Sequence, residues 1–412
     1  MKRTLLCASA LCGSLILVQP AQAACTTSTD GQKTVTCTGD TASTVAIGAD
    51  VDRFTNDGNI AVSLGLAVTA GTNTGDFTNS GTITSTSNQI YSVRIDGFRE
   101  GAVLSNSGTI STGSNGAAAI AIGGIATVRN SGSIVTLPGS GNSIGLAIEG
   151  GGDIANLAGG EIRGGFAGIR ASDRTRLVNA GTISGANGAL LGNGSSIDNS
   201  GTITGSSNAV AIASDGTVIN REGGQLIGTG IAPAILLQSG SNTILNSGRI
   251  DTTGTSFGSA ATVVILRASA DKSSTLVNTA TGVIGHPGQD SGDDAILGAG
   301  GALSIANAGL IHADISLNGG GAPRTVLNGY DLAGNAVDGP SRIEGDLYFN
   351  GSDDTVRVRN RGTILGDIYF GEGVNELYNS GTINGNISDV GGAANHIVLA
   401  GTLNGDGSLH GT

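Results

Sequence analysis

The sequence predicts an all-β protein, a right-handed parallel β-helix whose coils stack into a rod. Three observations lead to this fold class. A short phrase built around Asn recurs along almost the whole chain, and short runs rich in Ile and Val lie between its copies. In addition, 72 of the 412 residues are Gly, so no long helical period survives beyond the N-terminal segment. Because one coil cannot bury its apolar side chains alone, the coils must stack to form a core.

The recurring phrase reads apolar-x-Asn-x-Gly-x-Ile, as in Phe77-Thr-Asn-Ser-Gly-Thr-Ile83 and Leu377-Tyr-Asn-Ser-Gly-Thr-Ile383. Its apolar-x-Asn core occurs fourteen times, at intervals of 19 to 32 residues. These Asn residues are Asn56, Asn79, Asn106, Asn130, Asn156, Asn179, Asn199, Asn220, Asn246, Asn278, Asn307, Asn328, Asn360 and Asn379. Fourteen coils spaced by about 4.8 Å predict a rod of roughly 65 Å.

An apolar residue stands two positions before every Asn, on the same face of the strand, and ten phrases have Ile four positions after it. At Asn156, Asn220 and Asn278, two extra residues precede the closing apolar residue, which a corner accepts. Each phrase is therefore interpreted as strand, Gly-assisted corner and strand. The Asn side chains are expected to be structural: they tolerate a left-handed backbone and hydrogen-bond from coil to coil as a ladder.

A second apolar run follows most phrases, for example Ala119–Ile122, and its length and Gly or Ser borders favour a buried strand. We expect regular coils over residues 51–383 and incomplete terminal coils over 384–412. The open sheet edge at that end invites self-association. The segments 271–274 and 286–294 are expected to protrude as loops, where repeat proteins often carry function.

The N-terminal segment, residues 1–23, has the pattern of a secretory signal peptide, with Lys2 and Arg3 before an apolar run and Ala21-Gln-Ala23 before a cleavage site. The chain is therefore expected to be exported. Cys25 and Cys37 remain after cleavage, and an oxidising compartment favours a disulfide between them over two free thiols. This disulfide would staple an N-terminal cap over residues 24–50.

Composition excludes some partners. The formal net charge is −12, and neither basic clusters nor aromatic stacking platforms occur, which argues against nucleic acid and anionic lipid. The four His residues are scattered without metal-ligand spacing, so no metal or cofactor is expected. These residues are His286, His312, His396 and His410.

Two acidic motifs suggest chemistry. Ser291-Gly-Asp293-Asp294 resembles the paired aspartates of β-helical polygalacturonases, in which adjacent carboxylates act as acid and base, but that family's flanking Asn-Thr-Asp and Gly-His-Gly motifs do not occur. A polysaccharide hydrolase or lyase using Asp293 and Asp294 is therefore kept only as an alternative. Asp353-Asp354 resembles half of a calcium-binding nonapeptide, but this motif needs repetition and occurs once.

From about residue 340 the phrase changes to Ile343-Glu-Gly-Asp-Leu-Tyr-Phe349 and Ile364-Leu-Gly-Asp-Ile-Tyr-Phe-Gly-Glu-Gly373. With the repeated Asn-Ser-Gly-Thr-Ile phrases, the chain over about 51–400 resembles the passenger domain of Gram-negative autotransporters, near the C-terminal end of the passenger. The resemblance implies display at the cell surface or secretion. It also implies a non-catalytic role in adhesion, aggregation or matrix contact, with a host or bacterial surface glycan or protein as partner.

Autotransporters of this family end in an outer-membrane translocator barrel, whose strands alternate apolar and polar residues between aromatic girdles. This sequence has no such pattern, no Trp and only 3% aromatic residues. We therefore expect the barrel to be encoded downstream or supplied as a separate protein. A haemagglutinin-like exoprotein secreted by a separate transporter is a further alternative, although the Asn-Pro of its secretion motif does not occur.

Overall fold

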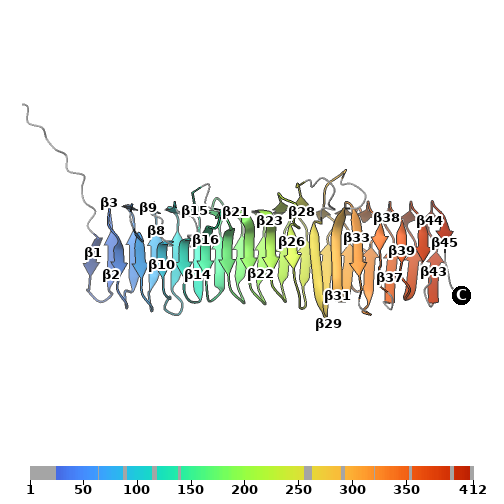
Figure 1. Cartoon of the computed structure of the whole chain (residues 1–412), viewed down its shortest axis with the longest axis horizontal. Helices are drawn as coiled ribbons and strands as arrows, with labels where there is room; N and C mark the ends of the chain where they lie inside the picture. Colours follow the sequence, from blue (N-terminus) through green and yellow to red (C-terminus); the bar gives the residue numbers. More distant parts are fainter. Residues whose placement is uncertain are drawn as a thin grey trace, which may run out of the picture.

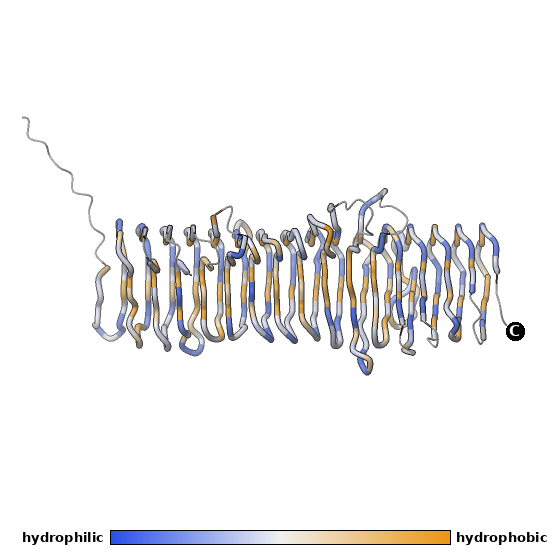
Figure 2. The backbone as a smooth tube through the Cα atoms, viewed as in Figure 1, coloured by the Kyte–Doolittle hydropathy of each residue, from blue (hydrophilic) through white to orange (hydrophobic). Residues whose placement is uncertain are grey.

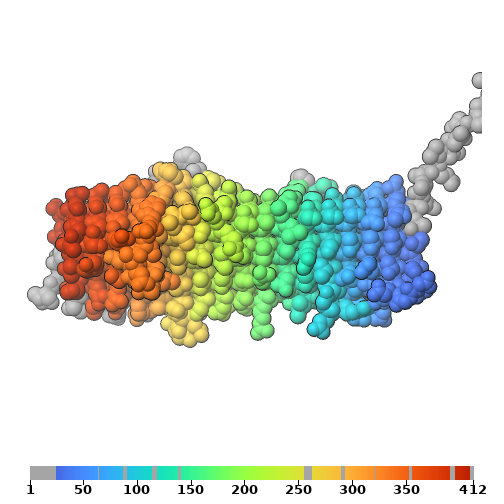
Figure 3. All heavy atoms as spheres, turned by 180° about the vertical axis from the view of Figure 1, so that it is seen from behind, coloured from blue at the N-terminus to red at the C-terminus, as the bar shows by residue number. Residues whose placement is uncertain are grey.

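The computed structural model describes most of the chain between Cys25 and Ser408. The described ranges are 25–63, 65–86, 91–113, 118–137, 141–254, 262–288, 293–319, 321–351, 355–389 and 394–408. Within them the protein is all-β, with parallel strands stacked into a solenoid of about 15 turns (Figure 1), which confirms the predicted fold class. The turns follow one another along the rod in sequence order (Figure 3). The predicted signal peptide lies outside the described residues.

Each turn contributes strands to three walls. The first, which we call the asparagine wall, holds the strands that end at the fourteen Asn residues, and one further strand at each end of the rod. Its strands are β2 (Thr34–Cys37), β5 (Arg53–Asn56), β8 (Asp76–Asn79), β11 (Val103–Asn106), β14 (Ala126–Asn130), β17 (Gly152–Asn156), β20 (Arg176–Asn179), β22 (Ser196–Asn199), β24 (Thr217–Asn220), β27 (Thr243–Asn246), β29 (Val264–Asn278), β31 (Asp294–Asn307), β34 (Arg324–Asn328), β37 (Thr355–Asn360), β40 (Val374–Asn379) and β43 (Ala394–Leu399).

The second wall follows the Asn corner and holds the closing apolar residues. Its strands are β3 (Asp40–Thr41), β6 (Asn59–Val62), β9 (Thr82–Ser85), β12 (Thr109–Thr112), β15 (Ser133–Thr136), β18 (Glu161–Arg163), β21 (Thr182–Leu191), β23 (Thr202–Ile212), β25 (Gln225–Gly228), β28 (Arg249–Thr252), β30 (Val283–Ile284), β32 (Leu310–Ile311), β35 (Arg342–Ile343), β38 (Thr363–Ile364), β41 (Thr382–Ile383) and β44 (Thr402–Leu403).

The third wall contains the second apolar run of each turn. Its strands are β4 (Val45–Ile47), β7 (Val68–Ala70), β10 (Tyr91–Ile95), β13 (Ala118–Ile122), β16 (Ile144–Ile148), β19 (Ala167–Ala171), β26 (Ile235–Leu237), β33 (Asp314–Asn318), β36 (Leu347–Tyr348), β39 (Ile368–Phe370), β42 (Ile387–Asp389) and β45 (Gly407–Ser408). The long strands β21 and β23 continue into this wall from the second, and β29 and β31 continue from it into the asparagine wall.

The three walls enclose one continuous apolar core. Polar and apolar segments alternate along the turns (Figure 2), because neighbouring residues of a strand face opposite sides of its wall. The residue two before each Asn is buried, as is the closing Ile, and both stack on their equivalents in the next turn. Near the N-terminus the rings of Phe54 and Phe77 meet in one of these columns, tilted by 36° to each other, with centroids 4.6 Å apart. Burial of these columns is the main drive for stacking.

The fourteen Asn side chains form a continuous ladder of hydrogen bonds along one corner. In every consecutive pair, Nδ2 of one Asn donates to Oδ1 of the Asn in the next turn over 2.7–2.9 Å. Nδ2 of Asn199 also donates to the carbonyls of Gly201 and Gln225, over 3.0 and 3.3 Å. Each ladder side chain is at most 2% exposed. Because a buried amide without partners is costly, the ladder holds successive turns in register.

The left-handed backbone expected at the ladder Asn residues is wrong. Among the described residues, those other than Gly with positive φ are Asp50, Asn73, Arg174, Asp215, Ala313 and Ser341, and none of them belongs to the ladder. Each ladder Asn is instead the last residue of a strand, so its side chain points inward like the apolar residue two positions earlier.

Glycine is required at the corner because stacked turns leave no space there for a side chain. A Cβ at Gly108 would lie 2.0 Å from the carbonyl oxygen of Gly81, and a Cβ at Gly201 would lie 2.2 Å from that of Gly181. Both distances are far below van der Waals contact. The phrase therefore needs Gly two residues after Asn because successive corners approach closely.

The ladder ends at two residues of other types. Cys37 stands at its position in the first turn, in register with Asn56, and Leu399 stands there in the last described turn. Within the described chain, Oδ1 of Asn56 accordingly accepts no hydrogen bond. Cys37 forms a disulfide with Cys25 of β1 (Cys25–Ser28), which pairs antiparallel with β2. The disulfide thus lies at the end of the ladder.

The parallel turns begin before the predicted N-terminal limit, and they continue into the predicted terminal coils. The strands β2, β3 and β4 stack in parallel register on β5, β6 and β7, so the turns begin at Thr34 rather than at residue 51. Only β1 covers the first turn as a cap. At the other end β42 to β45 continue the same register, within the segment 384–412 where terminal coils are expected. Sequence reasoning missed the first turn because Cys37 stands there at the ladder position in place of Asn.

The segment 271–274 is part of β29 rather than a separate loop. The register of pairing between β29 and β31 shifts between Ala268 and Ser273. At this point the two strands protrude from one edge of the rod (Figure 1). Ser274 is buried, and its Oγ accepts a hydrogen bond from the backbone of Asn242 over 2.9 Å. In the second predicted loop, Nδ1 of His286 lies 2.9 Å from a carboxylate oxygen of Asp251, and residues 289–292 lie outside the described part.

Substitution of one rung tests the ladder. Asn199→Leu removes the acceptor of Asn179 and the donor to Asn220, so the free energy of unfolding should fall by about 1–3 kcal/mol. Equilibrium denaturation followed by circular dichroism measures the change. Ser206→Leu, at an exposed position in the same turn whose side chain makes no hydrogen bond within the described residues, is the control and should stay within about 0.5 kcal/mol of the unaltered chain. Equal losses in both variants would contradict a stabilising ladder.

Candidate functional site

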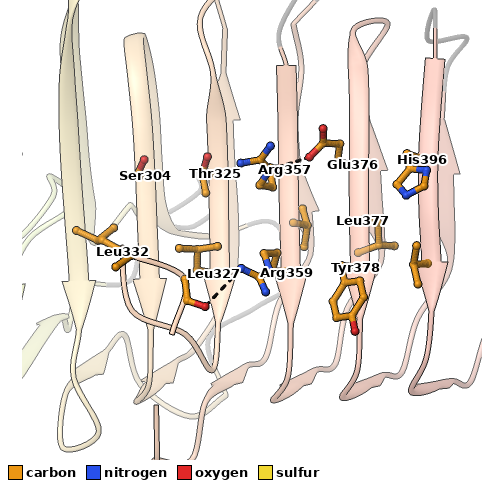
Figure 4. Close-up of a pocket in the computed structure, with 14 residues that line it drawn as sticks. Ser304, Thr325, Leu327, Leu332, Arg357, Arg359, Glu376, Leu377, Tyr378 and His396 are labelled. Carbon is orange, nitrogen blue, oxygen red and sulfur yellow. Dashed lines mark hydrogen bonds and ion pairs between the residues drawn. The ribbon is translucent and has the colours of Figure 1, made fainter. Parts of the chain in front are cut away.

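An open hollow of about 490 Å³ lies on the outer face of the asparagine wall, toward the C-terminal end of the rod (Figure 4). The side chains one and three residues before each Asn point outward on this face. We call this site the C-terminal hollow. It is lined by Ser304, Thr325, Leu327, Leu332, Ala333, Gly334, Arg357, Val358, Arg359, Glu376, Leu377, Tyr378, His396 and Val398.

One rim of the C-terminal hollow is a hairpin inserted into the corner after Asn328. Leu332 stands four residues after this Asn, at the spacing of a closing residue, but its side chain is 43% exposed. Ile343 fills the closing position instead and stacks in register between the closing Ile residues of the neighbouring turns. Residues 329–341 are therefore an insertion. Sequence reasoning missed it, although Tyr330 in place of the corner Gly was a signal.

The inserted hairpin is held by hydrogen bonds of its own. Tyr330 and Ala336 form an antiparallel bridge. The carboxylate of Asp331 accepts hydrogen bonds from the side chain and the backbone N–H of Asn335, over 3.0 and 2.8 Å, and these bonds hold the pKa of Asp331 below its usual value. Nη1 of Arg361 donates to the carbonyl of Val337 over 3.0 Å. The hairpin is thus an ordered element.

Tyr330 anchors the hairpin on the wall. It is 7% exposed and packs with Ala306 and Leu327, two outward-facing residues of the asparagine wall, with Val277 at the margin. These apolar side chains face away from the core, and the ring of Tyr330 covers them from outside the wall. Burial of an aromatic ring is a strong contribution, so the hairpin is held flat against the wall.

An ion pair forms the polar floor of the C-terminal hollow. Nε of Arg357 donates to Oε2 of Glu376 over 2.7 Å. This hydrogen bond, with the charge of Arg357, holds the pKa of Glu376 below its usual value. Both side chains are well exposed, so the pair adds little to stability. Its consequence is that one carboxylate and one guanidinium are kept facing the hollow.

Arg359 lies between two tyrosines beside this ion pair. Its guanidinium is 4.4 Å from the ring centroid of Tyr330 and 5.9 Å from that of Tyr378. Nη1 also donates to the carbonyl of Gly334 in the hairpin over 3.4 Å. Figure 4 shows Arg359 next to the hairpin with the ring of Tyr378 on the following strand. The ring of Tyr378 is 40% exposed.

The same face carries a second hollow near the N-terminal end. It measures about 480 Å³ and lies over β5, β8, β11 and β14. No inserted segment contributes to its lining, which is formed by Arg53, Thr55, Asp76, Thr78, Val103, Ser105 and Arg129. The two hollows therefore differ in that an insertion walls the C-terminal one, whereas the lining of the N-terminal one comes from the strands of the wall.

The candidate catalytic residues Asp293 and Asp294 lie elsewhere, where the chain enters β31. Asp294 accepts a hydrogen bond from the hydroxyl of Ser316 over 2.5 Å. Its partial burial raises its pKa, the bond from Ser316 opposes this, and the charge of Asp293 adds to it. The neighbouring Ser291 lies outside the described residues.

The carboxylates near Asp294 serve the stacking of turns. At this corner Oδ1 of Asp314 accepts the backbone N–H of Asp346 over 2.8 Å, and Oδ1 of Asp346 accepts that of Asp367 over 2.7 Å. Oδ1 of Asp367 in turn accepts the N–H of Asn386 over 2.6 Å. This second ladder explains the Gly-Asp motif of the C-terminal turns, which sequence reasoning recorded without assigning it a role.

Two tyrosines complete the second ladder. The hydroxyls of Tyr348 and Tyr369 donate to Asp346 and Asp367 over 2.8 and 2.9 Å, and the two rings stack with centroids 4.8 Å apart. The bond to Asp367 and partial burial raise the pKa of Tyr369 to about 12. The tyrosine and aspartate side chains therefore satisfy one another by hydrogen bonding and ring stacking within the protein.

The described ranges contain no cluster of side chains arranged to bind a metal ion. No group of three or more His, Cys, Asp or Glu residues is placed there to hold an ion. His286 contacts Asp251, His312 contacts Glu344 and His396 lines the C-terminal hollow, so the histidines are dispersed. His410 and the calcium-like pair Asp353-Asp354 lie outside the described residues.

Comparison with known proteins identifies no relative. The chain matches no protein-family model, no curated protein and no solved structure. Among the described residues, no helix has the length and apolar character to cross a membrane. Functional inference therefore depends on the site itself.

Truncation of Tyr330, which anchors the inserted hairpin, should release the hairpin from the asparagine wall. Tyr330→Ala removes the buried ring, which weakens attachment to the wall by about 3 kcal/mol, so thermolysin should cut within residues 331–340 much faster. Limited proteolysis with mass spectrometry measures the cleavage. Tyr330→Phe keeps the ring and loses only a hydroxyl contact of 3.4 Å to Ser380, so it should resist cleavage like the unaltered chain. Slow cleavage of the Ala variant would contradict the anchor.

The second ladder should make stability depend on acid pH. The N–H of Asn386 lowers the pKa of Asp367 below 3.8, so its stabilising effect is present above about pH 4 and is lost as pH falls through the lowered value. Asp367→Asn copies the residue of the next turn and cannot titrate. The drop in Tm between about pH 5 and pH 2.5 should therefore be smaller in this variant. An unchanged drop would show that Asp367 does not couple to folding.

Proposed function

We propose that this chain is an exported, non-catalytic binding protein that holds a glycan in the C-terminal hollow. The observation that carries the proposal is the inserted hairpin. It turns part of a flat wall into a concavity, and it brings Leu332 and Gly334 next to outward-facing polar and aromatic side chains. Departures from a regular repeat are where such proteins commonly bind ligands.

The chemistry of the hollow suits a saccharide. A sugar ring has hydroxyl groups and an apolar face, and the hollow offers partners for both. Arg357, Glu376 and Thr325 can exchange hydrogen bonds with hydroxyls. The exposed ring of Tyr378 and the exposed side chain of Leu332 provide apolar contact surface. The hollow is open along the wall, which allows a longer chain to extend beyond it.

Two features that fit export support an extracellular ligand. The signal-like residues 1–23 and the disulfide between Cys25 and Cys37 both fit an oxidising compartment. The resemblance to autotransporter passengers suggests display at the cell surface, with a translocator barrel in the same protein or a separate one. Adhesion to a glycan on a host or bacterial surface, or in a matrix, is the role that we propose.

The hydrolase alternative has less support. The raised pKa of Asp294 suits a general acid. However, the nearby carboxylates of Asp314 and Asp346 accept backbone N–H groups of the next turn and are engaged in stacking. A polysaccharide-cleaving site needs a second carboxylate free to act on the substrate or on water.

Removal of the hairpin tests the proposal. Replacing residues 329–341 by Ser-Gly creates Asn-Ser-Gly-Arg-Ile, the same corner that this chain has from Asn246 to Ile250. The variant should stay folded but lose glycan affinity about tenfold or more, because one rim of the hollow is gone. A glycan array identifies the ligand, calorimetry measures its affinity, and circular dichroism verifies the fold.

Three outcomes would count against the proposal. Unchanged affinity after replacement of the hairpin would place the ligand elsewhere on the rod. A folded, unaltered chain that bound no saccharide on the array would contradict glycan binding. Release of reducing or unsaturated ends, abolished by Asp293→Ala and Asp294→Ala together, would favour the hydrolase or lyase.

A further inference from the structure

We infer that the C-terminal hollow recognises a carboxylate on its ligand through Arg359, so that the glycan is acidic and contains uronate residues. This inference rests on the proposed function, because it names the class of saccharide that the hollow would hold.

Arg359 differs from its neighbour in having no carboxylate partner. Arg357 forms an ion pair with Glu376, whereas no acidic side chain in the described part of the chain lies within ion-pair distance of Arg359. A guanidinium has five N–H donors, and one long hydrogen bond, to Gly334, is formed with the protein. Most donors of Arg359 are therefore available to a ligand.

The guanidinium is also held in place before a ligand arrives. The ring of Tyr330 lies 4.4 Å away, and that ring is itself buried under the hairpin. Contact with an aromatic face restrains the plane of an arginine, and a planar, restrained fork suits the two oxygens of a carboxylate. The hairpin thus contributes to recognition in two ways, as the rim of the hollow and as the support of Arg359.

The net charge of the C-terminal hollow favours a ligand group that carries a single negative charge. Arg357 and Arg359 supply two positive charges and Glu376 removes one, which leaves a net charge of +1 with His396 neutral. A phosphate monoester carries about 1.5 to 2 negative charges near pH 7, which exceeds this balance and brings more charge toward Glu376. A uronate carries one negative charge and presents hydroxyls to the ion pair beside it.

The position of Tyr378 completes the match. Its ring centroid is 5.9 Å from the guanidinium of Arg359, and the ring is partly exposed on the next strand. A pyranose whose carboxylate bonds Arg359 can therefore lay its apolar face near this ring. Adjacent turns lie about 4.8 Å apart, close to the length of one sugar residue, so neighbouring sugars could meet successive strands.

Matched ligands and variants test the inference. The probes are a galacturonate tetrasaccharide, the same tetrasaccharide with its carboxyl groups reduced, and a sulfated neutral tetrasaccharide. Calorimetry with the folded chain should show binding of the uronate at least about tenfold tighter than of the reduced form. Arg359→Met should lower uronate affinity about 10- to 100-fold. Arg170→Met, at an exposed position on the third wall, should leave it unchanged.

Arg359→Lys separates shape from charge. Lysine keeps the positive charge but lacks the planar fork, so this variant should recover only part of the uronate affinity lost in Arg359→Met. The fold of each variant is verified by circular dichroism and Tm. Full recovery by Lys would contradict bidentate recognition.

The outcomes distinguish this inference from the proposed function. Equal binding of the uronate and its reduced form, unaffected by Arg359→Met, would overturn the inference and leave glycan binding intact. Tighter binding of the sulfated probe than of the uronate would also overturn it, because the anion recognised would then be a sulfate. Failure of all three probes, together with an array on which no saccharide bound, would overturn both.

Discussion

Hydrogen bonding between equivalent amides in successive turns is the constraint on which the rest of this structure depends. A buried Asn must find partners for its donors and its acceptor, and here the next turn supplies them at a fixed position. This demand aligns the fourteen turns that carry a ladder Asn with one another. It also fixes which residues of the asparagine wall face outward, because side chains alternate along a strand. The ladder therefore determines where functional side chains can stand.

The corner after the ladder is where the repeat tolerates added residues. Two extra residues follow Asn156, Asn220 and Asn278 without any change in the register of the next strand, and a hairpin follows Asn328 under the same condition. The hairpin differs because Tyr330 finds an apolar patch on the outer face of the wall. The inserted residues thereby form one rim of the C-terminal hollow. Register is preserved by the ladder, while shape is altered by the insertion.

Charged side chains have two distinct roles along the rod. At the corner near β33 and β36, carboxylates accept backbone N–H groups of the next turn and tyrosine hydroxyls, which consumes their hydrogen-bonding capacity inside the protein. On the asparagine wall, one N–H of Arg359 bonds the carbonyl of Gly334, and its other donors have no hydrogen-bond partner within the described residues. Acidic residues are therefore largely structural in this region, although the chain is acidic overall. Arg359 is therefore the charged group that we propose for recognition of a carboxylate.

The sequence by itself determined the solenoid, the positions of the ladder Asn residues and the pairing of Cys25 with Cys37, because these follow from a local pattern repeated many times. It did not determine the backbone conformation at the Asn corner, where close approach of turns is the reason for Gly. Nor did it reveal the C-terminal hollow. Arg359, Tyr330 and Tyr378 come from different turns, and Leu332 has the spacing of a closing residue. Only the folded stack shows that Ile343 closes that turn and that the hairpin lies on the wall, since both depend on packing between distant residues.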